Sequence, residues 1–153
     1  MLKHISNIIN IIIVLSSVHS NAQTFKSQKT LDGFGKLYVK ITGFTNDLGE
    51  CWFALDNSKT IYESDDSVFI GKILPIINNE VIVEIDSIEF GIYAIRVFHD
   101  ENSNGELDTD LLGIPSEDYG YSNNVSAWFG PPSWERAMFL FNQKVMSIEI
   151  FID

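Results

Sequence analysis

The amino-acid sequence predicts an all-β fold, an antiparallel two-sheet sandwich of the immunoglobulin-like or transthyretin-like type with about seven strands and one long acidic loop. Short segments alternate between apolar and polar residues with the two-residue period of a strand. Gly, Asn, Asp or Pro residues separate these segments, and helical periodicity is nearly absent. A closed β-barrel is the alternative architecture for such a chain.

The N-terminal residues have the features of a secretory signal peptide. Lys3 gives a basic start, residues 8–15 form an apolar run, and a small-residue site ends at Ala22, after which cleavage is expected. The apolar run is interrupted by Asn10 and is shorter than the ~20 residues of a membrane-spanning helix. We therefore expect export to the periplasm or the extracellular space, with no membrane insertion after the signal is removed.

These features divide the chain into three parts. Residues 1–22 form the predicted signal peptide, 23–35 a flexible leader, and 36–153 a single β-sandwich domain. A single cysteine, Cys51, excludes an internal disulfide, and its distance from the cleavage point excludes a lipid anchor there. Because it lies in the apolar run CWFAL, we expect it to be a small buried hydrophobic residue.

The chain is acidic, with 21 Asp and Glu against 10 Lys and Arg and a net charge of −11. Nucleic acids and anionic membrane surfaces are poor partners for such a field. A hydrophobic content of 45% excludes general disorder.

Strand patterns are clearest in EVIVEID, where Val81, Val83 and Ile85 share one face and Glu84 and Asp86 lie on the other, and in the last segment, where every second residue is Met or Ile. The first two strands, joined by the turn at residues 46–49, are expected to form a hairpin. One helical turn, with Ser133 as its N-cap, is expected in SWERAM. Strands are predicted at residues 36–44, 51–55, 68–74, 80–88, 92–99, 138–141 and 145–152.

Residues 99–137 form one long region without a strand pattern, and such loops usually carry function or bind something that orders them. The stretch HDENSNGELDTD places side-chain oxygens at every second position before a glycine. Calcium takes six to eight oxygen ligands, and this spacing matches the first nine positions of a D-x-[DN]-x-[DN]-G calcium loop. The predicted calcium ligands are Asp100, Asn102, Asn104, the backbone carbonyl of Glu106, Asp108 and, folding back, Asp110 or Glu117.

The predicted loop is not an EF-hand, because Leu111 occupies position twelve and no helix flanks it. Few charged ligands imply weak affinity, roughly 10⁻⁴ to 10⁻³ M. The alternative is a plain turn, since Asp and Asn side chains hydrogen-bond their own backbone. We favour the cation because seven acidic residues lie within residues 100–118, whereas no Lys or Arg lies between Arg96 and Arg136.

His99 shares its predicted strand face with Tyr93, Ile95 and Val97, so we expect a histidine packed at the core edge that orients the loop. Zinc is not favoured, because no second His or Cys lies nearby. A catalytic pair with Asp100 is also disfavoured, because neighbours in a strand point to opposite faces and no local signature marks an activated nucleophile. We therefore expect a protein that is not an enzyme.

Four stretches carry a family resemblance: GIYA at 91–94, HDENSNGELD at 99–108, LGIPSEDYGYSNN at 112–124 and PPSWERA at 131–137. In this order they resemble the secreted bacterial family filed as domain of unknown function 2141. Asp118 stands where the family pattern usually has glycine, Tyr121 stands for phenylalanine, and Trp134 is the aromatic of the last stretch. The resemblance implies a sandwich module beside bacterial envelope proteins and no established activity. The change at position 118 bears on one turn that glycine would allow to take a positive φ.

Aromatic residues crowd the second half of the long loop, where they either stack on a sugar or peptide ligand or form a small core that holds the loop to the sheet. We favour the small core. The first functional hypothesis is a non-catalytic secreted or periplasmic module, stabilised by calcium, that binds or assembles with a protein or glycan of the cell envelope. The second is a carbohydrate-binding module that uses Tyr121, Trp128 and Trp134, and the third is a hydrolase with an unidentified nucleophile.

Overall fold

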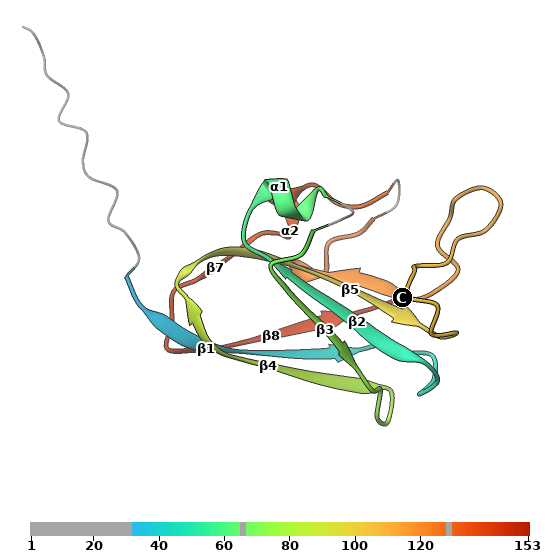
Figure 1. Cartoon of the computed structure of the whole chain (residues 1–153), viewed down its shortest axis with the longest axis horizontal. Coiled ribbons are helices and arrows are strands. Elements are labelled where there is room, and N and C mark those ends of the chain that lie inside the picture. The colour runs from blue at the N-terminus through green and yellow to red at the C-terminus, as the bar shows by residue number, and fades with distance from the viewer. Residues whose placement is uncertain (1–31, 65–66, 128–129) are drawn as a thin grey trace, which may run out of the picture.

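The computed structural model describes residues 32–64, 67–127 and 130–153, which form two facing β-sheets (Figure 1). One sheet has the strand order β4-β1-β8; the other has the order β3-β2-β5-β6, with β7 also paired to β5. The predicted all-β sandwich is confirmed. The described residues contain eight strands: β1 (Phe34–Thr42), β2 (Glu50–Asp56), β3 (Ile70–Leu74), β4 (Glu80–Glu89), β5 (Gly91–Asp100), β6 (Tyr119–Tyr121), β7 (Phe139–Phe141) and β8 (Val145–Phe151).

Strand β1 lies in the middle of the three-stranded sheet. It runs antiparallel to β4, with Val39 opposite Val83, and parallel to β8, with Val39 opposite Ile148. The parallel pair departs from the expected wholly antiparallel arrangement. Parallel neighbours need a long connection, and between β1 and β8 that connection is the rest of the domain.

The five-stranded sheet is built around β5. One edge of β5 pairs with β2. Along the other edge, residues 91–93 of β5 pair with β7 and residues 96–98 pair with β6. Strand β6 lies within the region that was expected to contain no strand. Its three residues are too few for a two-residue period to be recognised in the sequence.

The alternating patterns bury one face of each sheet, as predicted. Val81, Val83 and Ile85 of β4 are each at most 5% exposed, whereas the residues between them, Ile82 and Glu84, are exposed. Cys51 is fully buried, and burial raises the pKa of its thiol to about 12. The two inner faces meet in one cluster that includes Leu37, Val39, Ile41, Phe53, Leu55, Ile95, Val97, Phe141, Ile150 and Ile152.

The predicted hairpin between the first two strands is wrong, because β1 and β2 belong to different sheets. The connection between them, residues 43–49, crosses one end of the sandwich. Phe44 is buried in it, and Asp47 accepts hydrogen bonds from the backbone N–H groups of Asn78 (2.9 Å) and Asn79 (2.6 Å). The turn residues seen in the sequence therefore anchor a crossover between sheets.

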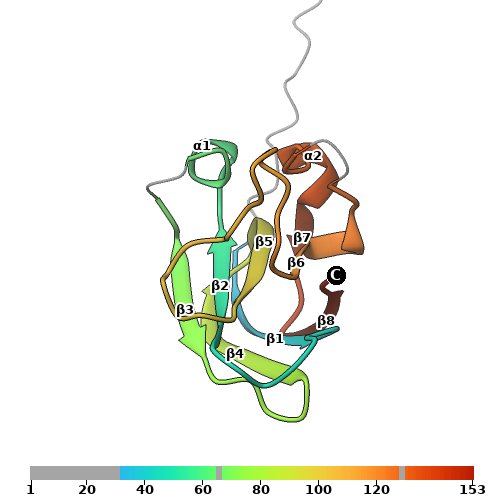
Figure 2. The same cartoon turned by 90° about the vertical axis from the view of Figure 1, so that its right-hand side faces the viewer.

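Short helices α1 (Lys59–Tyr62) and α2 (Trp134–Ala137) lie on the same side of the molecule (Figures 1 and 2). The first was not predicted; Ser58 precedes it and accepts a hydrogen bond from the N–H of Ile61 (3.4 Å). The second was predicted. Ser133 occupies its N-cap position, but the serine side chain makes no capping hydrogen bond.

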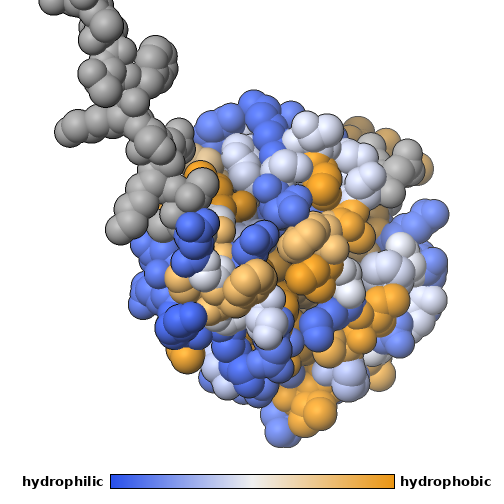
Figure 3. Space-filling model, turned by 60° about the vertical axis from the view of Figure 1, so that its left-hand side comes forward, coloured by the Kyte–Doolittle hydropathy of each residue, from blue (hydrophilic) through white to orange (hydrophobic). Residues whose placement is uncertain are grey.

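Strand β1 begins two residues before the predicted domain boundary at Lys36. The predicted signal peptide lies outside the described residues, among which no helix has the length and apolar character needed to cross a membrane. Figure 3 shows apolar side chains gathered across the middle of one face, with polar side chains around them. Phe34, Val145 and Phe151 are among the exposed large apolar residues.

Candidate functional site

The acidic loop, residues 100–118, leaves the end of β5 and returns at β6, and Figure 2 shows it in front of the sheets. Asp100, the last residue of β5, is fully buried. Its Oδ1 accepts the N–H of Asn104 (3.0 Å), and its Oδ2 accepts the N–H of Gly105 (2.8 Å). Gly105 has a φ of 83°, a left-handed conformation that glycine adopts without steric cost. Asp100 therefore holds the predicted bend closed.

Four predicted calcium ligands, Asp100, Asn102, Asn104 and Asp108, share one hydrogen-bond network, which we call the oxygen cluster. The side-chain amides of Asn102 and Asn104 each donate to a different carboxylate oxygen of Asp108. The amide oxygen of Asn102 accepts the N–H of Asn104 (2.9 Å), the residue that also bonds to Asp100. The spacing seen in the sequence thus brings these four side chains together.

Of the remaining predicted ligands, Glu106, expected to use its backbone carbonyl, is hydrogen-bonded to the oxygen cluster, whereas Asp110 is not. Glu106 donates its backbone N–H to the amide oxygen of Asn104 (2.8 Å) and has an exposed side chain. Asp110 uses its Oδ1 to accept the N–H groups of Leu112 (2.8 Å) and Ile114 (3.0 Å). That carboxylate caps the following turn, and no hydrogen bond joins Asp110 to the oxygen cluster.

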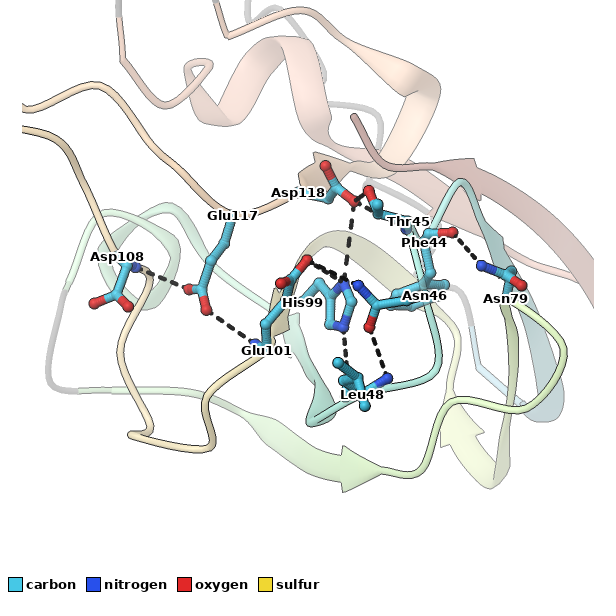
Figure 4. Close-up of polar contacts among 10 residues, drawn as sticks. All are labelled: Phe44, Thr45, Asn46, Leu48, Asn79, His99, Glu101, Asp108, Glu117 and Asp118. Atoms are coloured by element: carbon cyan, nitrogen blue, oxygen red, sulfur yellow. Dashed lines mark hydrogen bonds and ion pairs between the residues drawn. The ribbon is translucent and has the colours of Figure 1, made fainter.

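Glu117 clamps the two ends of the loop together (Figure 4). It is 8% exposed, and its two carboxylate oxygens accept the N–H groups of Glu101 (2.9 Å) and Asp108 (2.9 Å). The sequence suggested this residue only as a further ligand. Glu117 lies sixteen positions from Glu101 and nine from Asp108 along the chain. No local sequence pattern indicates contacts over such separations.

His99 lies below the loop and is fully buried, as its strand face predicted. The ring packs edge-on against Phe44, with 5.3 Å between ring centroids. Its Nε2 lies 2.7 Å from the carbonyl oxygen of Leu48 in the crossover connection. Asp118, the residue that replaces the expected glycine, is not among the described residues with a positive φ, so the turn tolerates the change.

A groove of about 1120 Å³ lies on the outer face of the five-stranded sheet. On its floor the rings of Trp52 and Phe98 stack with 5.7 Å between centroids and 15° between planes. Leu107 of the acidic loop lines one side, and a Cβ on Gly105 would lie 3.4 Å from Cζ2 of Trp52. The acidic loop is therefore one wall of the groove. Other lining residues include Tyr62, Lys72, Arg96, Tyr119, Tyr121 and Pro132.

Two of the predicted ligand-stacking residues pack against the same small second core in the structure, and one of them also lines the groove. Tyr121 lines the groove next to Tyr119, and burial raises the pKa of its hydroxyl to about 12. Trp134 packs edge-on against Tyr62, with 5.8 Å between centroids, in a small second core. Trp128 lies outside the described residues. The expected small core thus includes both Trp134 and Tyr121, and Tyr121 also lines the groove.

The stretch Ser122-Asn123-Asn124 fastens the long loop to the sandwich. Ser122 is buried, accepts the N–H of Ile95 (2.9 Å) and donates to the carbonyl of Ala137 (2.6 Å). Asn123 donates to that same carbonyl (3.1 Å), and Asn124 accepts the N–H of the last β8 residue (2.8 Å). These polar residues are structural, which their sequence alone did not indicate.

Fold and site together define an all-β sandwich module with an acidic loop at the end of one sheet and a groove beside it. Residues 39–149 match the model of a bacterial family described as "Uncharacterized protein conserved in bacteria (DUF2141)". The chain belongs to this family, in agreement with the resemblance carried by its motifs. Comparison with curated proteins and with solved structures finds no match.

Proposed function

We propose that the protein is an exported, non-catalytic binding module in which a calcium ion fixes the acidic loop and the adjacent groove takes a macromolecule of the cell envelope. The observation that carries this proposal is the position of the oxygen cluster. It lies in the loop that forms a wall of the groove, so an ion that orders the loop also shapes the groove.

The negative charge of the acidic loop supports the proposal that it binds a calcium ion. Asp100 and Glu117 are buried carboxylates, and among the described residues no Lys or Arg makes an ion pair with either of them or with Asp108. Buried anions normally have a cationic partner or a metal ion. Backbone N–H groups partly stabilise these carboxylates, and a bound ion would neutralise them.

Oxygen ligands favour calcium for this position. Asn102 and Asn104 present an amide oxygen when the amide is turned over, and Asp108 presents two carboxylate oxygens. A site with two carboxylates and two amides has few charges and is expected to bind calcium weakly, at roughly 10⁻⁴ to 10⁻³ M. Such an affinity suits a compartment rich in calcium, which accords with the export expected from the N-terminal residues.

The groove supports a binding role, and its rings favour a glycan as the second candidate function. Trp52, Phe98, Tyr119 and Tyr121 give it aromatic surfaces with polar groups beside them. Aromatic faces stack on sugar rings and supply a large contact area with little loss of side-chain entropy.

Two potential nucleophiles among the described residues, Cys51 and Ser122, support the part of the proposal that the protein is not an enzyme. Cys51 is buried and remains a thiol at neutral pH, since its pKa is raised to about 12. The hydroxyl of Ser122 is committed to two backbone groups. These residues give no support to the hydrolase alternative.

Titration of the full chain with soluble N-acetylglucosamine oligomers and glucans, by calorimetry and tryptophan fluorescence, tests the groove. Saturable binding is expected, and Tyr121→Ala should weaken it at least about fivefold, the equivalent of about 1 kcal/mol. Tyr38→Ala, a half-buried tyrosine in the other sheet, is the matched control and should bind normally. Trp52→Phe should keep the affinity but lose the fluorescence change. Equal binding by the two alanine variants would refute the groove as the site.

A further inference from the structure

A second group of polar side chains lies where β5 ends and the crossover connection passes over it. Among the described residues, His99, Glu101 and Asp118 are the one set of three or more His, Cys, Asp or Glu whose ligand atoms all lie within 4.8 Å of one another (Figure 4). The backbone holds the set in place, because the N–H of His99 donates to the carbonyl of Asp118 (2.8 Å). None of these three residues belongs to the oxygen cluster.

The contact with Leu48 fixes the proton of the His99 ring. A carbonyl oxygen only accepts hydrogen bonds, so Nε2, which lies 2.7 Å from the carbonyl of Leu48, carries the proton. In the neutral ring, Nδ1 then has a free lone pair. This nitrogen is buried and has no hydrogen-bond partner, a costly state for a polar atom.

The unpartnered Nδ1 faces two carboxylates. It lies 3.7 Å from Oε1 of Glu101 and 4.0 Å from Oδ2 of Asp118. A lone pair that faces two anions is unfavourable, and both separations are too long for a hydrogen bond from a protonated ring. A metal ion among the three atoms would satisfy the nitrogen and neutralise both carboxylates.

The dimensions suit a zinc-like ion. Metal bonds of ~2.0 to 2.2 Å at tetrahedral angles place neighbouring ligand atoms ~3.4 Å apart. The observed separations from Nδ1, 3.7 and 4.0 Å, therefore need only a small closure of two side chains. Glu101 is 41% and Asp118 23% exposed in their side chains, so water can reach a fourth position.

The surrounding contacts are those that support metal ligands. A metal-bound histidine usually donates its other N–H to a carbonyl or carboxylate, as His99 does to Leu48. Asp118 is held by the N–H and the hydroxyl of Thr45 (3.1 and 2.6 Å), and Glu101 by the amide of Asn46 (3.3 Å). All three supporting residues come from the crossover connection.

We propose that His99, Glu101 and Asp118 form a second cation site, selective for a divalent transition-metal ion such as zinc. An imidazole nitrogen favours zinc, nickel and copper over calcium and magnesium, which prefer oxygen ligands alone. The site therefore differs in its metal from the oxygen cluster. The sequence pointed away from zinc because it holds no second His or Cys here, and the carboxylates that complete the set become neighbours only in the fold.

Calorimetric titration of the full chain with Zn²⁺ tests this site. Glu101→Gln and Asp118→Asn should each weaken zinc binding about tenfold or more. Glu89→Gln, which removes one charge from an exposed position of β4, is the matched control and should bind like the parent. His4 and His19, which lie outside the described residues, are present in every sample. Any zinc that they bind therefore contributes equally to each titration and does not affect the comparison between variants.

Nitrogen NMR of the His99 ring in the unaltered protein gives an independent readout that does not depend on variant stability. Zinc should shift the Nδ1 resonance and leave Nε2 protonated, whereas millimolar calcium should leave both unchanged. An unshifted Nδ1 at saturating zinc would overturn the site. Equal zinc affinity of Glu101→Gln, Asp118→Asn and Glu89→Gln would overturn it as well. Neither result would bear on calcium binding by the oxygen cluster.

Discussion

The guanidinium group of Arg96 donates hydrogen bonds to both carboxylate oxygens of Asp56, whose side chain is fully buried. Nε lies 2.8 Å from Oδ2, and Nη2 lies 3.3 Å from Oδ1. The arginine also lies 5.6 Å above the ring of Tyr62 and lines the groove. The pair therefore connects β2 and β5 beside the groove.

Removal of Arg96 is expected to be strongly destabilising. Arg96→Met leaves the carboxylate of Asp56 buried without a charge partner, at a cost of about 3 to 5 kcal/mol in the free energy of unfolding. Urea unfolding measures this loss. Lys36→Met is the control, because its partners Glu84 and Asp86 are exposed and such pairs contribute about 0 to 1 kcal/mol. Similar losses in the two variants would contradict the interpretation.

Calcium is expected to raise the melting temperature of the protein relative to a chelator. At ten times the dissociation constant the gain is about 1.4 kcal/mol, or roughly 4 °C for a domain of this size. Asp108→Asn should abolish most of the shift. Asp110→Asn should keep it, because that carboxylate caps its own turn. Calcium binding by the oxygen cluster is ruled out if the parent melts at one temperature in both buffers.

Loss of the Glu117 clamp is expected to loosen the acidic loop. Glu117→Gln replaces one acceptor oxygen by an amide that cannot accept an N–H, which costs about 1 to 3 kcal/mol locally. Hydrogen exchange at the amides of Glu101 and Asp108 should then accelerate by roughly tenfold or more. Glu106→Gln, an exposed change in the same loop, should leave both rates unaltered. The clamp would be refuted by unchanged protection in Glu117→Gln.

Stability is expected to fall in alkali, beginning with Cys51. Its thiol has an ordinary pKa of 9.0 and a folded pKa of about 12, so between these values the unfolded chain loses a proton that the folded chain keeps. The free energy of unfolding is therefore unaffected by this group below pH 9 and falls by about 1.4 kcal/mol per pH unit above it.

Tyrosines join this alkaline loss only above their ordinary pKa of 10.0, since burial also raises the pKa of Tyr121. The interval from pH 9 to pH 10 thus isolates the thiol. Urea unfolding in that interval should show a decline in the parent that is absent from Cys51→Ala. Parallel declines in both proteins would contradict burial of the thiol as the cause.

The strands were predictable because one face of each is buried, which produces the two-residue period of β4 and β8. Their partners were not, because pairing joins residues far apart in the chain. The crossover at residues 43–49 has the turn residues of a hairpin, but β1 and β2 belong to different sheets, and Phe44 is buried between them against His99.

The site was predictable where its contacts are local. Asp100, Asn102, Asn104 and Asp108 lie within nine positions, and their spacing alone indicated that they meet. Longer-range contacts carried no local signal. The groove, the Arg96 pair and the approach of Asp118 to His99 all depend on strands that the topology brings together.

The parallel pairing of β1 with β8 has a consequence for biosynthesis. A nascent chain lacks one neighbour of its first strand until the ribosome has released residues 145–151. Closure of the three-stranded sheet must therefore follow translation of the final strand. A product truncated before that point would leave the backbone of β1 bare along one side, open to annealing with another copy.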